Sequence, residues 1–135
     1  MGIISEYSSM PNLLLSPIGI KNCDVDKYTS FNAIWDTGAN NTLISSECVK
    51  LLMLKRVGQD LIKAYNGDTH LVSLYEISIC FPQLNIGYPK IRVSDGIEKS
   101  GPFDIIIGLD IISQGDFRYY KKEEKYILDF DINIT

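Results

Sequence analysis

Hydrophobic residues in this chain come in short runs separated by turn-forming residues, a pattern that predicts an all-β protein with one or two short helices. The predicted strands cover residues 13–15, 18–20, 28–35, 42–45, 57–65, 69–81, 90–94, 117–120 and 125–130. No solenoid-type repeat, low-complexity tract or linker interrupts this series. We therefore expect residues 1–135 to form a single domain.

The connections between these runs carry their own signals. Asn66 and Gly67 separate the runs 57–65 and 69–81, and Asn-Gly between two extended runs predicts a hairpin because both residues tolerate positive φ. We expect this hairpin to project from the body of the protein. Ser46 is placed to cap a short helical turn through residue 52, and residues 109–113 are expected to form a second short helix that ends at Gly115.

Composition excludes several classes of function. The chain has 135 residues, of which 45% are hydrophobic and 22% charged, as in an ordinary globular protein. Its longest apolar stretches are too short to span a bilayer. The net charge is −4 and the basic residues are scattered, so no stripe suited to phosphates is present. We expect neither a membrane nor a nucleic acid as partner.

The cysteines do not predict a chemical site. Cys23, Cys48 and Cys80 have the spacing of neither a Cys-x-x-Cys metal site nor a dense disulfide framework, and we expect them to be reduced core or boundary residues. The single histidine, His70, has nothing in the sequence to orient it toward a thiol. The first residues lack the basic region and long apolar stretch of a secretory signal, so a cytoplasmic location is expected.

Two segments far apart in the sequence share one design. In the first, residues 33–38 (Ala-Ile-Trp-Asp-Thr-Gly), an apolar run ends in the carboxylate of Asp36, and Gly38 lets the backbone turn sharply behind it. In the second, residues 105–108 (Ile-Ile-Ile-Gly), three isoleucines end in a glycine that can pack against such a turn without a side chain. The two segments are therefore expected to meet.

This pair of motifs resembles the retropepsin type of aspartic protease, in which an apolar strand ending in glycine crosses beside an Asp-Thr-Gly loop. The likeness spans residues 18–130, and the segment 108–112 is more similar to cellular and bacterial members than to viral ones. The resemblance implies a closed, barrel-like acid-protease fold with one lobe per chain. It also implies a homodimer that hydrolyses peptide bonds in extended substrates without a metal or an organic cofactor.

The dimer follows from the chemistry of the reaction. Attack of water on an amide needs a base and an acid, and two adjacent carboxyls that share one proton supply both. This chain has one Asp-Thr-Gly, so the second carboxyl must come from Asp36 of another copy, related by a two-fold axis.

The resemblance assigns roles to individual residues. Asp36 matches the catalytic aspartate, Thr37 the threonine that holds the two loops across the dimer axis, and Gly38 the glycine near the substrate backbone. The remaining implied residues are Ala39, Asn40, Tyr65, Asn66 and Gly67 as substrate contacts, the last three at a flap that closes over the peptide, and Ile106, Ile107 and Gly108 as supports of the loop.

The sequence also departs from the retroviral pattern. Asn40 stands where those enzymes carry Asp, and Leu109 stands where they carry the Arg that pairs with it, so this ion network is missing. If the termini of two copies interleave in a sheet, as in the family, Ile3, Ile4 and residues 132–134 are the apolar candidates.

Other readings of the same residues remain open. Asp104 and Asp110 are expected to be strand-end and helix-cap residues, and Trp35 to fill a core or an interface. A catalytically inactive member of the fold that binds peptides or mediates dimerisation would keep the groove without depending on Asp36. Phosphoryl transfer through an aspartyl intermediate is disfavoured, because no α/β alternation with a phosphate-binding loop follows Asp36.

Overall fold

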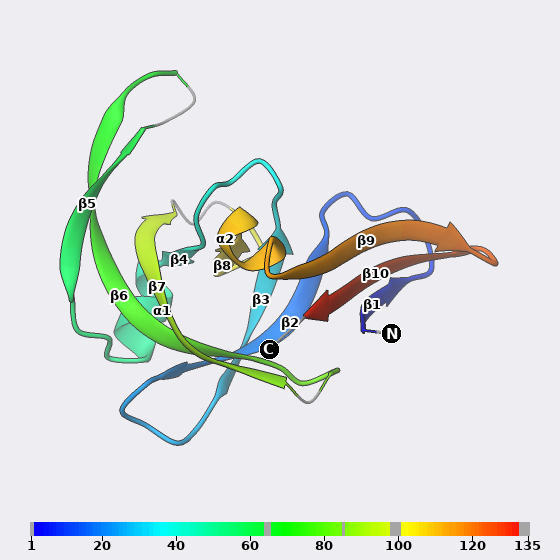
Figure 1. The fold of residues 1–135 in the computed structure, drawn as a ribbon, viewed down its shortest axis with the longest axis horizontal. Helices are drawn as coiled ribbons and strands as arrows, with labels where there is room; N and C mark the ends of the chain where they lie inside the picture. The colour runs from blue at the N-terminus through cyan, green and yellow to red at the C-terminus, as the bar shows by residue number, and fades with distance from the viewer. Residues whose placement is uncertain (1, 64–65, 85, 98–100, 133–135) are drawn as a thin grey trace.

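The computed structural model describes residues 2–63, 66–84, 86–97 and 101–132. Within them the chain forms strands joined mostly by short turns, with two short helices (Figure 1). The elements in chain order are β1 (Ile3–Tyr7), β2 (Leu15–Asn22), β3 (Thr29–Trp35), β4 (Leu43–Ser45), α1 (Ser46–Leu51), β5 (Gly58–Lys63), β6 (Thr69–Phe81), β7 (Ile86–Ile97), β8 (Ile105–Ile107), α2 (Leu109–Ile112), β9 (Gly115–Lys122) and β10 (Lys125–Ile132). The predicted all-β class with one or two short helices is confirmed.

The larger sheet closes into a barrel. Its strands follow the order β2-β3-β8-β4-β7-β6, and β2 pairs with β6 to complete the ring. β5 extends the sheet beyond β6 and forms with it the predicted hairpin, which projects from the barrel (Figure 1). Isoleucines on β2, β6 and β8 fill the interior, where many of them are fully buried. Burial of these side chains removes apolar surface from water and supplies much of the driving force for folding.

A smaller three-stranded sheet packs beside the barrel, in the order β1-β10-β9. β10 is its central strand, with β1 on one side and β9 on the other, all antiparallel. β1 was not among the predicted strands. Because β1 pairs within its own chain and Ile4 is 3% exposed there, the Ile4 side chain belongs to the core of the single chain. Residues 133–134, the other predicted terminal contacts, lie outside the described part.

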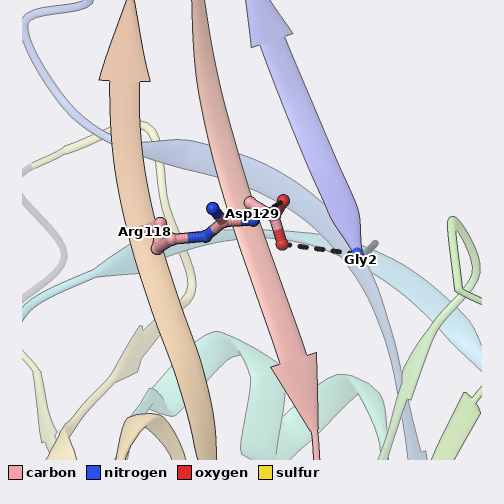
Figure 2. A network of polar contacts seen from close by, with 3 residues as sticks. All are labelled: Gly2, Arg118 and Asp129. Carbon is pink, nitrogen blue, oxygen red and sulfur yellow. Dashed lines mark hydrogen bonds and ion pairs between the residues drawn. The ribbon is translucent and has the colours of Figure 1, made fainter.

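An ion pair crosses this smaller sheet (Figure 2). The carboxylate of Asp129, 1% exposed, accepts a hydrogen bond from Arg118 Nη2 at 2.9 Å and one from the Gly2 backbone N–H at 3.3 Å. Asp129 lies directly opposite Arg118 in the ladder between β10 and β9. A buried carboxylate is tolerated only when donors surround it, so these contacts join all three segments of the sheet.

Trp35 connects the barrel to the smaller sheet. Its ring lies 5.9 Å from Phe81 of β6, 5.7 Å from Phe117 of β9 and 5.2 Å from Phe130 of β10, measured between centroids. The indole N–H donates to Ser16 Oγ at 3.0 Å, which satisfies the one polar atom of this buried side chain. The end of β3 is therefore held from several directions.

Several local details differ from the sequence-based expectations. The side chain of Ser45, not Ser46, caps α1 by accepting the Cys48 N–H, so the cap lies one residue earlier than predicted. β7 begins before and ends after the predicted run 90–94, because it pairs along the length of β6. No helix in the described ranges is both long and apolar enough to cross a membrane.

The Arg118–Asp129 ion pair yields the first prediction. Arg118→Met should lower the free energy of unfolding by about 2 kcal/mol, because it leaves the buried Asp129 carboxylate without its cationic partner, while solvent screens part of the attraction at Arg118, which is 57% exposed. Lys90→Met is the matched control: it breaks the exposed Lys90–Glu76 pair, whose lysine is 60% exposed, and should cost less than about 1 kcal/mol. Urea unfolding measures the free energy of unfolding of both variants. Equal losses of stability would mean that the Arg118–Asp129 pair contributes no more than a surface pair.

Cys48 yields a second prediction. Burial raises the pKa of its thiol to about 12, and the negative charge of Asp104 adds to this shift. Thiol reagents react with the thiolate, so in the folded protein at pH 8 only the half-buried Cys23 and Cys80 should react with Ellman's reagent. Cys48→Ala should leave the native thiol count unchanged and lower the count in denaturant by one. A lower native count in this variant would contradict the assignment.

Candidate active site

Asp36 and Gly108 lie next to each other because the strands that precede them run parallel. β3 pairs with β8 in the register Ala33 to Ile105, Ile34 to Ile106 and Trp35 to Ile107. The Asp36 backbone N–H then donates to the Ile107 carbonyl at 3.0 Å, which extends the ladder by one bond. The two motifs found in the sequence therefore meet at their ends.

The turn after Asp36 holds its carboxylate in place. Gly38 N–H donates to Asp36 Oδ1 at 2.9 Å, and Ala39 N–H donates to the Asp36 carbonyl at 3.2 Å. The Asp36 side chain is half-buried, whereas Thr37 and Gly38 are exposed at the tip of the turn. The carboxylate is thus oriented by the backbone while its surroundings remain open to a second molecule.

Gly108 packs directly against the far side of this loop. A Cβ at position 108 would lie 2.7 Å from the carbonyl carbon and oxygen of Asn41 and 2.9 Å from the Ala39 oxygen. The φ of Gly108 is −98°, so lack of space, not backbone conformation, requires the glycine. Leu109 N–H donates to the Ala39 carbonyl at 2.8 Å and Asp110 N–H to the Asn40 carbonyl at 3.2 Å, which ties the start of α2 to the loop.

Asp110 and Thr42 form a cross-link that the sequence reasoning did not find. Thr42 donates its backbone N–H to Asp110 Oδ2 at 3.0 Å and its hydroxyl to Asp110 Oδ1 at 2.7 Å. The Thr42 hydroxyl in turn accepts the Gly108 N–H at 3.2 Å. Asp110 was expected to cap α2. The N-cap residue is Gly108, but the Asp110 carboxylate does accept the Ile111 N–H of α2 at 2.9 Å, and it also holds the end of the loop. The signal available in the sequence was an acid in the first helical turn, where the helix dipole favours it.

The hairpin of β5 and β6, the flap hairpin, rises on the same side of the barrel as the loop after β3 (Figure 1). At its tip Asp68 N–H donates to Asn66 Oδ1 at 3.0 Å, and Gly67 has a φ of +91° that a glycine adopts without strain. Asn66 and Gly67 are exposed, and Tyr65, the third predicted flap residue, lies outside the described part of the chain.

A groove of about 300 Å³ lies between the loop and the flap hairpin. Gly38, Ala39, Asn40 and Asn41 form one wall, and residues 60–63 of β5 form the other. The predicted site residues that line this groove are Gly38, Ala39 and Asn40. Ile106, Ile107 and Gly108 lie behind the loop, and Asn66 and Gly67 lie away from it at the hairpin tip.

A second cavity of about 250 Å³ adjoins this groove and shares Asn41, Asp60 and Ile62 with it. Arg92 of β7 is also part of its lining, so both signs of charge are present. Asp60 and Ile62 were not predicted as site residues. Their alternate positions on the predicted strand 57–65 were the available sign that they share one face. Among the described residues, no group of three or more His, Cys, Asp or Glu side chains is arranged to hold a metal ion.

The close approach at Gly108 yields a third prediction. Gly108→Ala should destabilise the protein by about 1–3 kcal/mol and displace the loop, because its methyl group would meet backbone that cannot move aside alone. Gly58→Ala is the control: its Cβ would meet only the Leu74 side chain at 3.6 Å. Thermal unfolding measures the loss of stability in each variant, and the amide chemical shifts of residues 36–42 report the displacement of the loop. A Gly108→Ala protein as stable as Gly58→Ala would contradict the packing described here.

No family model and no curated protein matches this sequence. Among solved structures, the chain is similar to a retropepsin-like aspartic protease from Rickettsia conorii, with a TM-score of 0.56 and 12% identity over 98% of this chain and 96% of that chain. It is also similar to the foamy viral protease-reverse transcriptase, solved in complex with an RNA/DNA hybrid, with a TM-score of 0.50 and 28% identity over 76% of this chain and 12% of that chain. The match to the bacterial protein runs over nearly the full length of both chains, and on this evidence the chain has the retropepsin-like aspartic protease fold.

Proposed function

We propose that this chain is an aspartic endopeptidase in which Asp36 from each of two copies activates a water molecule. One observation carries the proposal: Asp36 lies half-buried at the end of β3, and its carboxylate is oriented by the Gly38 N–H. The retropepsin-like fold supports it, and so does the position of Gly38, which lines the groove two residues after Asp36.

The proposed chemistry needs two carboxyls that share a single proton. The ionised carboxylate removes a proton from water as the water attacks the peptide carbonyl, and the protonated carboxyl donates to the carbonyl oxygen or the leaving amine. Two carboxylates that share a proton would repel each other if both were ionised, so one carboxyl of the pair keeps its proton. The chain has one Asp-Thr-Gly, and the second carboxyl therefore comes from the Asp36 of a second copy.

The groove between the loop and the flap hairpin suits an extended peptide. Strands border it on the β5 side, and an extended substrate pairs its backbone with such edges while alternate side chains enter pockets. In this proposal the flap hairpin covers the peptide, Thr37 holds the two loops across the dimer axis, and no metal or organic cofactor takes part.

Cleavage of a diverse peptide library between about pH 3 and pH 8 tests the activity, at protein concentrations high enough to populate a dimer. Asp36→Asn should lower the rate by at least about a hundredfold, since the amide can neither accept nor share the proton, and the wild-type rate should show a bell-shaped dependence on pH. Asp26→Asn makes the same chemical change on an exposed turn and should leave the rate unchanged.

Equal cleavage by wild type and Asp36→Asn would refute the peptidase. If neither protein cuts any peptide while the wild type still binds members of the library, the non-catalytic peptide-binding module becomes the better account of the fold.

A further inference from the structure

Exposed hydrophobic side chains gather where α1 ends beside the turn between β2 and β3. Val25, Leu51 and Met53 are 46%, 64% and 77% exposed. Together with Leu52 they line a hollow of about 160 Å³, the apolar hollow. Among the described residues that line it, Lys27 is the charged one. Large apolar side chains that remain in water around a hollow mark a surface that binds another molecule.

Hydrogen bonds fix the wall of the apolar hollow. The Asn22 side-chain amide donates to the Leu52 and Met53 carbonyls, each at 3.2 Å, and the Met53 N–H donates to the Lys50 carbonyl at 3.1 Å. Met53 has a φ of 50°, which is uncommon for a residue of this type. The turn therefore holds an exposed apolar side chain in a costly backbone conformation, and such conformations cluster at ligand-binding sites.

A second hollow of about 100 Å³ adjoins the first and shares Asn22 with it. Lys55 and Lys90 line this polar hollow, and Lys90 is paired with Glu76 at 3.5 Å. Lys55, like Lys27 of the apolar hollow, makes no ion pair with any residue that the structure describes. The apolar hollow thus lies beside cations that are available to an anionic group.

The segment that follows the helix is basic in an otherwise acidic chain. Residues 48–58 contain Lys50, Lys55 and Arg56 and no acid, and all three side chains are exposed. The total charge is −4, so the residues outside this segment carry −7. A positive segment on an acidic protein attracts a negatively charged partner and orients it.

We propose that this surface binds an extended acidic peptide segment of a partner protein, with one bulky apolar side chain in the apolar hollow and a carboxylate at Lys55. A hollow of this size receives a single side chain, and the adjoining hollow places the anionic group within a few residues of it. An anionic membrane fits less well, because its headgroups would also meet the exposed Asp24 and Asp26 of the same turn.

The surface is separate from the groove beside Asp36. β3 begins at Thr29, on the wall of the apolar hollow, and its seven residues end at Trp35, which precedes Asp36. A strand of this length extends about 20 Å. In Figure 1, α1 and the turn between β2 and β3 lie at the opposite end of the barrel from the loop after β3. A partner bound here leaves the groove free, and the inference does not depend on the proposed activity.

An array of random octapeptides tests the binding, with Asp36→Asn in every protein so that no peptide is cut. Bound peptides should carry a bulky apolar residue followed closely by acids. Met53→Asn should weaken their binding about tenfold or more, because it removes apolar surface from the hollow, and asparagine tolerates the positive φ. Met10→Asn makes the same change at a methionine that is 69% exposed outside both hollows, and should leave binding unchanged.

The ionic half of the contact has its own variant. Lys55→Glu should weaken binding of the same peptides, and binding to the protein that retains Lys55 should weaken as salt rises. Lys122→Glu is the matched control, because it makes the same change at an exposed lysine at the end of β9.

The cysteines report where the peptide binds. Cys23 lines the polar hollow, so a saturating peptide should slow its alkylation by iodoacetamide several-fold. Cys80 is also half-buried but lines neither hollow, and its alkylation should be unchanged. Mass spectrometry distinguishes the two cysteines within one sample.

Three results would overturn the proposal. They are an array without a bound peptide, peptides that bind Met53→Asn as well as Met10→Asn, and an unchanged rate of alkylation at Cys23. Binding to phosphatidylserine vesicles that depends on Met53, in a protein that binds no peptide, would assign the surface to a membrane instead. Because every protein in these tests lacks Asp36, none of these results bears on the proposed peptidase.

Discussion

The parallel pairing of β3 with β8 is the constraint on which the rest of the site depends. β8 has only three residues, and it lies between β3 and β4, where two of its three isoleucines are fully buried. Such a short strand gains little from its own hydrogen bonds and is held by burial on both faces. Because the two strands end at the same level, the Asp36 turn and Gly108 are brought into contact, and every further bond of the loop builds on this approach.

A second constraint lies behind the loop rather than beside it. Trp35 is 4% exposed and contacts aromatic rings from both the barrel and the smaller sheet, so the residue that precedes Asp36 is packed on several sides. The loop ahead of it keeps Thr37 and Gly38 exposed. Rigid support combined with an exposed tip is what a carboxylate needs in order to be placed accurately against a second molecule.

The sequence predicted best those features that depend on neighbouring residues. The Asn66-Gly67 hairpin and the short helix after Gly108 follow from turn chemistry and from short apolar runs, which act locally. The two strands predicted around Pro17 were wrong, because β2 continues through Pro17 from Leu15 to Asn22. The meeting of two distant motifs was predictable because the Asp-Thr-Gly turn and the apolar run ending in glycine occur together in the family that the sequence resembles. The Thr42–Asp110 cross-link was not, because 68 residues separate the partners and either side chain would be unremarkable on a surface.

The third strand of the smaller sheet was hidden for a similar reason, although β9 and β10 contain the predicted strands 117–120 and 125–130. Ile3 pairs with Asp129, so β1 depends on a contact between the two ends of the chain that no local pattern encodes. Asp129 lies between buried Leu128 and Phe130, and strict alternation along a strand would place its side chain in solvent. Its burial is tolerated because the carboxylate accepts hydrogen bonds from Arg118 and from the Gly2 N–H. The turn at Glu123 and Glu124 has φ values of 50° and 66°, a conformation for which asparagine and glycine are the usual signals.

The closure of the smaller sheet within one chain separates folding from assembly. When terminal strands of two copies interleave, a subunit without its partner lacks part of its sheet, and stability and association are a single equilibrium. Here β10 is paired on both sides by its own chain, and the aromatic cluster around Trp35 is complete without a partner. A subunit built in this way has a complete small sheet and a complete aromatic cluster of its own, so the fold does not depend on the second copy that the proposed activity requires.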